Sequence, residues 1–196
     1  MIAIVDYGAG NLNSVKKAFD YLGAKVVVTD RPATIAGADK IVFPGVGHFS
    51  SLQALEPTGL REALLQGASS GKPFLGICVG MQWLFEGSEE SPDVAGAGIF
   101  PGKCQRFPSS VKSPHVGWNS LAIQADSRLL RGIAQESYVY YTHSFHAPLV
   151  TSMSAATDYG LWFAGAVEQG NIFGVQFHPE KSGDVGLSIL KNFCEV

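Results

Sequence analysis

A cysteine between two glycines is the residue of this sequence best placed for covalent chemistry. Cys78 follows the apolar run Phe74 to Ile77 and lies two residues from both Gly76 and Gly80. The residues after it, Met81 to Phe85, predict a helix, so a strand, a sharp turn and a helix meet at Cys78. Small residues suit such a turn because neighbouring backbone comes too close for a Cβ, and a helix start favours a thiolate. We interpret Cys78 as a nucleophile; a buried core cysteine is the alternative.

A histidine near the end of the chain is the expected partner of that thiolate, which needs a base or an imidazolium beside it. His178 ends the apolar run Gly174 to Phe177, and Pro179 favours an extended conformation for it. Residues two apart in an extended chain point the same way, so we expect the carboxylate of Glu180 to hold the imidazole in one tautomer. Together, Cys78, His178 and Glu180 predict a triad for nucleophilic attack on a carbonyl carbon.

The elements that must position these residues form a predicted α/β fold. Strands are expected near residues 1–6, 25–29, 41–43 and 73–77, with helices near 12–22 and 60–66. This alternation predicts βαβ units, a parallel sheet and ligand sites at the carboxyl ends of its strands. Strand-like pieces follow at 98–107, 119–123, 138–141, 153–157, 162–167 and 172–176. They predict an antiparallel extension that continues into the main sheet, before a helix at 184–193. We expect a single domain over residues 1–196.

Composition limits the classes of partner. Charged residues make up only 16% of the 196 residues, against about 25% in an average domain, so we expect a protein partner to cover apolar surface. The net charge of −3, without a basic cluster, disfavours nucleic acid, and no apolar run of about 18 residues suits a membrane. Three widely spaced cysteines fit neither a disulfide framework nor a zinc site and favour the cytoplasm. We expect no metal and no other cofactor, because His143 and His146 lack a third ligand at suitable spacing.

Two motifs carry a resemblance to a known family. The elbow GICVGMQ around Cys78 and the later GVQFHPE around His178 resemble the class I (triad) glutamine amidotransferases, and the likeness covers essentially the whole chain. The resemblance implies a doubly wound, mainly parallel, flavodoxin-like sheet with helices on both faces and an antiparallel extension. It also implies that Cys78, His178 and Glu180 hydrolyse glutamine to glutamate and ammonia.

The same resemblance implies roles for residues around the triad. The oxyanion would be bound by the N–H of Val79 and by the loop PGVG, Pro44 to Gly47, where many relatives carry a PGGP-like sequence; Val46 is a departure from it. We expect a peptide of this loop to flip between a resting state and a state that donates to the oxyanion. The expected oxyanion donors are Val79, Val46 and Gly47, and the expected substrate contacts are Gly45, Gln82, Glu90, His143, Ser144 and Phe145.

Four further segments narrow the resemblance. The opening VDYGAGNLNS, the loop PGVG, the segment PHVGWN (residues 114–119) and HPEKS resemble the glutaminase subunits of imidazole glycerol phosphate synthases. This implies a heterodimer with a (β/α)8 cyclase subunit. That subunit would use the ammonia to make imidazole glycerol phosphate and aminoimidazole carboxamide ribotide, in histidine biosynthesis. The residues expected to face the partner are Asn11, Asn13, Trp118, Asn119 and Lys181.

Three alternatives stay open at this point. A class I glutaminase of another pathway shares the triad but lacks a PHVGWN-like segment. A stand-alone γ-glutamyl cysteine hydrolase would use the same triad without needing a partner. A non-catalytic scaffold is disfavoured, since Cys78, His178, Glu180 and both elbow glycines are present.

Overall fold

A computed structural model describes residues 1–124 and 126–196 of the chain. Within those residues the main sheet has eight strands in the order β2-β1-β3-β4-β13-β12-β11-β8. Strands β2, β1, β3, β4 and β13 are parallel, whereas β12, β11 and β8 continue the sheet in antiparallel pairing. The strands are β1 Ile2–Val5, β2 Val26–Thr29, β3 Lys40–Gly45, β4 Phe74–Cys78, β8 Ala122–Ile123, β11 Met153–Asp158, β12 Trp162–Gln169 and β13 Ile172–Val175.

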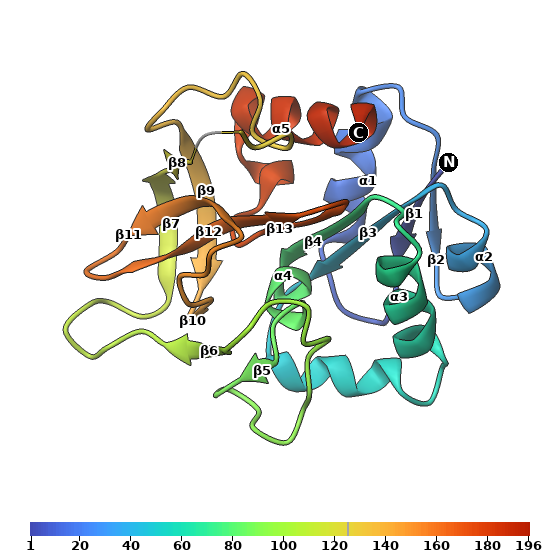
Figure 1. Cartoon of the computed structure of the whole chain (residues 1–196), viewed down its shortest axis with the longest axis horizontal. Helices are drawn as coiled ribbons and strands as arrows, with labels where there is room; N and C mark the ends of the chain where they lie inside the picture. Colours follow the sequence, from blue (N-terminus) through green and yellow to red (C-terminus); the bar gives the residue numbers. More distant parts are fainter. Residues whose placement is uncertain (125) are drawn as a thin grey trace.

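Helices cover both faces of the parallel half of this sheet (Figure 1). Helix α1 contacts α5 on one face, and α2 contacts α3 on the other. With both faces covered, the central strands must be apolar throughout, and every residue of β1 and of β4 is buried. The helices are α1 Leu12–Tyr21, α2 Pro32–Ala36, α3 Leu60–Ser69, α4 Val79–Trp83 and α5 Gly183–Glu195, with 3-10 helices η1 Phe49–Leu55 and η2 Pro179–Lys181.

The predicted α/β fold is confirmed, and helix α1 shows how its elements arise. Val15, Ala18 and Phe19 recur at helical spacing and are the buried residues of α1. Gly23 follows the helix with a φ of +74°, a left-handed conformation that glycine adopts without strain. The sequence did not predict α2, η1, β5 Gly87–Ser88 or β10 Phe145–His146. These elements are short, and a run of two to seven residues carries too few repeats for a periodic pattern to emerge.

The expectation that all the later strands join the main sheet is wrong for part of them. In the part of the chain described, strands β7 His115–Ser120 and β9 Tyr138–His143 pair only with each other, and β10, β6 Lys103–Arg106 and β5 form a separate three-stranded sheet. Alternating polar and apolar residues predict a strand, but they do not specify which neighbour it pairs with.

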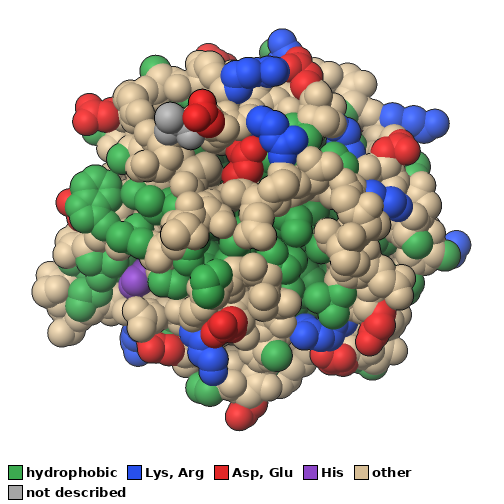
Figure 2. All heavy atoms as spheres, viewed as in Figure 1, with side chains coloured by type: hydrophobic (Ala, Val, Ile, Leu, Met, Phe, Trp, Pro, Cys, Tyr) green, Lys and Arg blue, Asp and Glu red, His purple; other side chains and the backbone are tan. Residues whose placement is uncertain are grey.

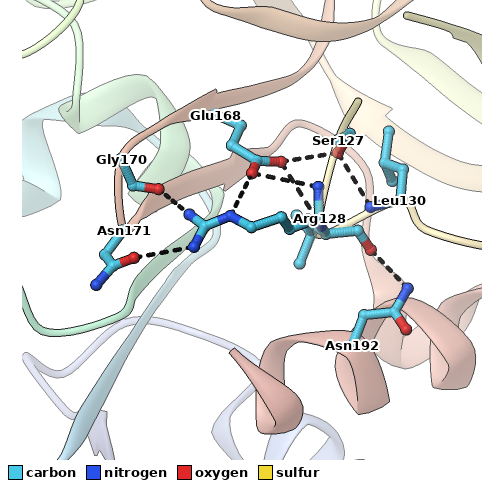
Figure 3. A network of polar contacts seen from close by, with 8 residues as sticks. Ser127, Arg128, Leu130, Glu168, Gly170, Asn171 and Asn192 are labelled. Carbon is cyan, nitrogen blue, oxygen red and sulfur yellow. Dashed lines mark hydrogen bonds and ion pairs between the residues drawn. The ribbon is translucent and has the colours of Figure 1, made fainter. Parts of the chain in front are cut away.

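Polar contacts attach the segment after β8 to the sheet and to α5 (Figure 3). The carboxylate of Glu168, on β12, accepts hydrogen bonds from the Ser127 hydroxyl at 2.8 Å and from the Arg128 guanidinium at 3.0 Å. The same guanidinium donates to Asn171 and Gly170 in the β12–β13 turn, while Asn192 of α5 donates to the Leu129 carbonyl. These bonds hold a segment without regular secondary structure against the antiparallel half of the sheet.

Part of the outer surface carries exposed apolar side chains. On the face seen in Figure 2, hydrophobic side chains gather across the left half and the centre, and charged ones lie mainly toward its edges. The exposed large hydrophobic residues include Val116, Trp118 and Tyr138, all on β7 and β9. Among the described residues, no helix has the length and apolar character needed to cross a membrane.

Candidate active site

The strand, turn and helix predicted around Cys78 are confirmed. Strand β4 ends at Cys78 and α4 begins at the next residue, with Cys78 at φ 55° and ψ −110°. This is a rare conformation for a residue with a Cβ, and it stores strain at the turn. A Cβ on Gly76 would lie 2.5 Å from the Gly80 carbonyl oxygen, and a Cβ on Gly80 would overlap the carbonyl of Phe43. Gly76 is therefore required for the elbow to close on itself, and Gly80 for the elbow to pack against β3.

His178 and Glu180 form a buried pair beside the elbow. The side chains are each 1% exposed, and His178 Nδ1 lies 2.9 Å from Glu180 Oε1. With Nδ1 bonded to Glu180, Nε2 is directed to the Cys78 thiol, without forming a hydrogen bond of ordinary geometry in the part of the chain described. Burial lowers the pKa of His178, but contacts with Cys78 and Glu180 outweigh it and raise the pKa to about 10. The ring is thus disposed to be an imidazolium next to the sulfur at neutral pH.

The route by which Glu180 reaches the ring differs from the expectation. His178 itself is extended, at φ −102° and ψ 96°, but Pro179 starts the 3-10 helix η2. Glu180 is therefore brought to the imidazole by the first turn of η2 and not by the alternation of a strand. Asn11, at the start of α1, adds a longer hydrogen bond of 3.4 Å to the same carboxylate oxygen.

A cleft of about 500 Å³ opens over Cys78 and His178. Most of the predicted oxyanion and substrate residues lie in its wall, whereas Glu180 lies behind His178 and not in the cleft itself. The lining residues are Gly10, Asn11, Val46, Gly47, Cys78, Val79, Gln82, Glu90, Pro114, Thr142, His143, Ser144, Phe145, His178 and Lys181.

The oxyanion loop lies directly across from the elbow. In the pairing of β3 with β4, Gly45 is opposite Cys78, and Val46 and Gly47 continue into the cleft wall. Gly45 is not among the lining residues: it packs beneath the elbow, where a Cβ would lie 2.7 Å from the Tyr7 hydroxyl and 2.8 Å from Val79 Cβ. A glycine is needed there for close packing, so a direct substrate contact by Gly45 stays a prediction.

Two polar residues of the cleft have part of their bonding capacity occupied. Gln82 Nε2 donates to the Phe145 carbonyl at 2.8 Å and to Gln176 Oε1 at 3.1 Å, which leaves Gln82 Oε1 as the atom available to a ligand. Glu90 Oε2 accepts from the Phe49 N–H at 2.8 Å, at the start of η1. Its other oxygen, Oε1, lies 3.9 Å from His48 Nε2.

One residue that contacts the nucleophile was not predicted from the sequence. Gln176, on the segment between β13 and His178, is fully buried, and its Nε2 lies 3.8 Å from Cys78 Sγ. A signal was present, because an amide inside the apolar run GVQF must find a buried partner. Which partner it finds depends on the pairing of β13 with β4, which the sequence does not specify.

Comparison with known proteins shows the family. Residues 3–196 match the family described as glutamine amidotransferase class-I. The chain belongs to this family. Imidazole glycerol phosphate synthase subunit HisH of Methanothermobacter thermautotrophicus is 50% identical over 100% of this chain and 98% of its own length. The subunit of the same name from Chlorobium luteolum is 47% identical over the full length of both chains.

Solved structures of amidotransferases share the fold. A crystal structure of a glutamine amidotransferase superposes with a TM-score of 0.77, at 17% identity, over 99% of this chain and 100% of its own. The structure of PurLQS from Thermotoga maritima gives a TM-score of 0.72 at 19% identity, over 99% and 97%. At such low identity the likeness concerns the fold alone, and it includes the mixed sheet described above.

The residues predicted to face a partner differ in their exposure and in whether they line the cleft of this amidotransferase. Trp118 is 54% exposed, and Lys181, in the cleft wall, has its Nζ 5.7 Å from the centre of the Tyr140 ring. Asn119 is turned inward, since its Nδ2 donates to the Asp158 carbonyl at 2.9 Å. Asn11 lines the cleft, whereas the exposed Asn13 does not.

Proposed function

We propose that this amidotransferase hydrolyses the side-chain amide of glutamine at Cys78 and supplies the ammonia to a partner subunit. The observation that carries the proposal is the strained cysteine elbow in the cleft together with His178, whose other ring nitrogen is bonded to the buried carboxylate of Glu180. A thiolate held beside an imidazolium is the arrangement that attacks acyl carbons and then protonates the leaving group.

The reaction proceeds in two steps through a thioester. The Cys78 sulfur attacks the carboxamide carbon, and the negative charge on its oxygen is accepted by the N–H of Val79 and by a donor from the Val46–Gly47 loop. His178 gives its proton to the departing ammonia. It then accepts a proton from the water that hydrolyses the γ-glutamyl thioester, which releases glutamate and frees the thiol. Glu180 keeps Nδ1 bonded throughout, so Nε2 stays the atom that exchanges protons.

The cleft suits an amino acid as substrate. Glu90 is largely buried, with 16% of its side chain exposed, and it lies in the cleft wall with a carboxylate oxygen free of backbone bonds. A carboxylate in that position attracts the α-ammonium group of glutamine. The backbone of Ser144 and Phe145, in the same wall, supplies polar groups for the α-carboxylate.

The partner that fits is a cyclase subunit, since the curated relatives are named as subunits of imidazole glycerol phosphate synthase. Outward-facing Val116 and Trp118 on β7, with Tyr138 on β9, form an exposed apolar surface next to the cleft residues Thr142 and Lys181. Burial of aromatic side chains is the usual source of affinity at such surfaces. A (β/α)8 subunit docked there covers the cleft and receives ammonia before water protonates it, in the histidine pathway of the cytoplasm.

Glutamate release from glutamine tests this function. The rate is measured for the purified chain alone and after addition of the cyclase subunit with its nucleotide substrate. We expect a slow rate alone, an increase of orders of magnitude with the partner, and loss of both in Cys78→Ala. Cys194→Ser is the matched control, because Cys194 is half-buried in α5 and outside the cleft, and it should behave as the wild type. A rate that is high alone and indifferent to the cyclase favours a stand-alone γ-glutamyl hydrolase.

A further inference from the structure

Two buried histidines outside the triad form a directional hydrogen-bonded pair. His115 of β7 lies opposite His143 of β9, and His115 Nδ1 is 3.0 Å from His143 Nε2. His143 Nδ1 is 2.9 Å from the Phe145 carbonyl oxygen, which can only accept, so His143 carries its proton on Nδ1. Its Nε2 must then accept, and His115 must donate from Nδ1. Burial lowers the pKa of His115 to about 4 and that of His143 to about 3, so both rings are neutral at pH 7, as this arrangement requires.

The Phe145 carbonyl connects this histidine pair to further hydrogen bonds that reach the nucleophile. It also accepts from Gln82 Nε2, at 2.8 Å, so Gln82 must present its nitrogen and not its oxygen. The same nitrogen lies 3.1 Å from Gln176, which must therefore present Oε1. The remaining amide group of Gln176, its Nε2, is left to face Cys78 Sγ at 3.8 Å. A main-chain carbonyl thus sets the orientation of two side-chain amides, and the second ends at the reacting sulfur.

At the end of this chain of hydrogen bonds that is farthest from Cys78, the His115 ring is held in place by aromatic packing. The His115 ring is stacked against Tyr159 at a centroid distance of 3.9 Å and against Tyr141 at 4.8 Å, nearly parallel to both. Asn119 Nδ2 lies 3.5 Å from His115 Nε2, the accepting nitrogen. His115 and Asn119 belong to the PHVGWN segment, so inward-facing residues of that segment lead by hydrogen bonds to the active site.

We propose that Gln176 is a further catalytic residue whose side-chain N–H donates to the Cys78 sulfur. His115, acting through His143, is a positioning residue that keeps this donor turned toward the sulfur. A thiolate accepts a hydrogen bond more strongly than a thiol, so a fixed donor favours the attacking form of the nucleophile. The proposal deepens the glutaminase function and rests on Cys78 being its nucleophile.

The experiment compares four variants in two assays. Gln176→Met has a side chain of similar length without an N–H, and His115→Leu removes the donor to His143. His115→Asn restores a donor near the position of Nδ1. His146→Leu is the matched control, because His146 is a buried histidine that packs at a tilt against Phe107 in the same aromatic cluster but contributes no bond to the chain of hydrogen bonds. The assays are alkylation of Cys78 by iodoacetamide at pH 7, and kcat and KM for glutamine in the complex with the cyclase subunit.

We expect Gln176→Met to slow alkylation and kcat about tenfold, as loss of a bond to a charged group does, with KM within twofold of wild type. His115→Leu should slow both several-fold, and His115→Asn should recover most of the loss, while His146→Leu stays at the wild-type rate. Equal alkylation of Gln176→Met and wild type would overturn the donor role. Equal effects of His115→Leu and His146→Leu would reduce His115 to a packing residue. If the alkylation rates of the variants change as expected but the wild-type complex does not hydrolyse glutamine, the glutaminase function is refuted and the chain of hydrogen bonds still stands.

Discussion

Replacement of Glu180 by glutamine removes the charge that faces His178 while keeping the shape of the side chain. Both side chains are 1% exposed, so water does not screen their interaction, and the bond between them is 2.9 Å long. The amide oxygen of a glutamine still accepts from Nδ1, so the loss lies at the low end of the range for bonds to charged groups, about 1.5 kcal/mol. This corresponds to roughly a tenfold decrease in kcat.

The pH profile shows whether the carboxylate acts through the imidazolium. Glu180 is one of the groups that raise the pKa of His178 to about 10, so its removal lowers that pKa toward the ordinary value. The imidazolium is then lost at lower pH, and the alkaline limb of the kcat profile should shift to lower pH in Glu180→Gln.

Glutamate release is measured between pH 6 and pH 11, with Glu56→Gln as the control, since Glu56 is an exposed carboxylate paired with Arg61. An alkaline limb and a kcat that both equal the wild-type values would refute this account of the pair.

Three other predictions concern stability and the elbow. Gly80→Ala should abolish glutamate release and lower the melting temperature by several degrees in calorimetry, because its Cβ would overlap the Phe43 carbonyl. Protons bind His115 and His143 more weakly in the folded than in the unfolded protein, so the free energy of unfolding should fall as the pH drops from about 6.5 to about 4. Urea titrations across this pH range should show a shallower fall for His115→Leu than for the wild type. Glu168→Ala should lose about 1–3 kcal/mol of unfolding free energy in urea titrations, because it removes the bonds to Ser127 and Arg128, and should keep kcat, because these bonds lie outside the cleft. An unchanged urea midpoint would contradict that role.

Local patterns explain why the nucleophile and its partner were predictable. The conformation of Cys78 depends on Gly76 and Gly80, which are near neighbours in sequence, and His178 lies two residues from Glu180. The parallel sheet was predictable for a similar reason, because strands buried on both faces read as continuous apolar runs.

Contacts between distant residues explain what the sequence did not reveal. Gln176 lies 98 residues from Cys78, and the two approach each other only because β13 pairs with β4 in one register. The separate β7–β9 sheet likewise follows from strand pairing, and so does the position of Asn119, whose side chain donates to the Asp158 carbonyl. A strand pattern gives two faces but does not say which face meets which neighbour.

The alternation of side chains along β7 has a consequence for how this protein can diverge. His115 is buried and the half-buried Asn119 lies on the same face of the strand, whereas Val116 and Trp118 point to solvent. Insertion or deletion of one residue within β7 would exchange these two sets, and would disrupt the partner surface and the internal hydrogen bonds in a single event. A substitution changes one face of the strand at a time, whereas a change in the length of β7 changes both faces together.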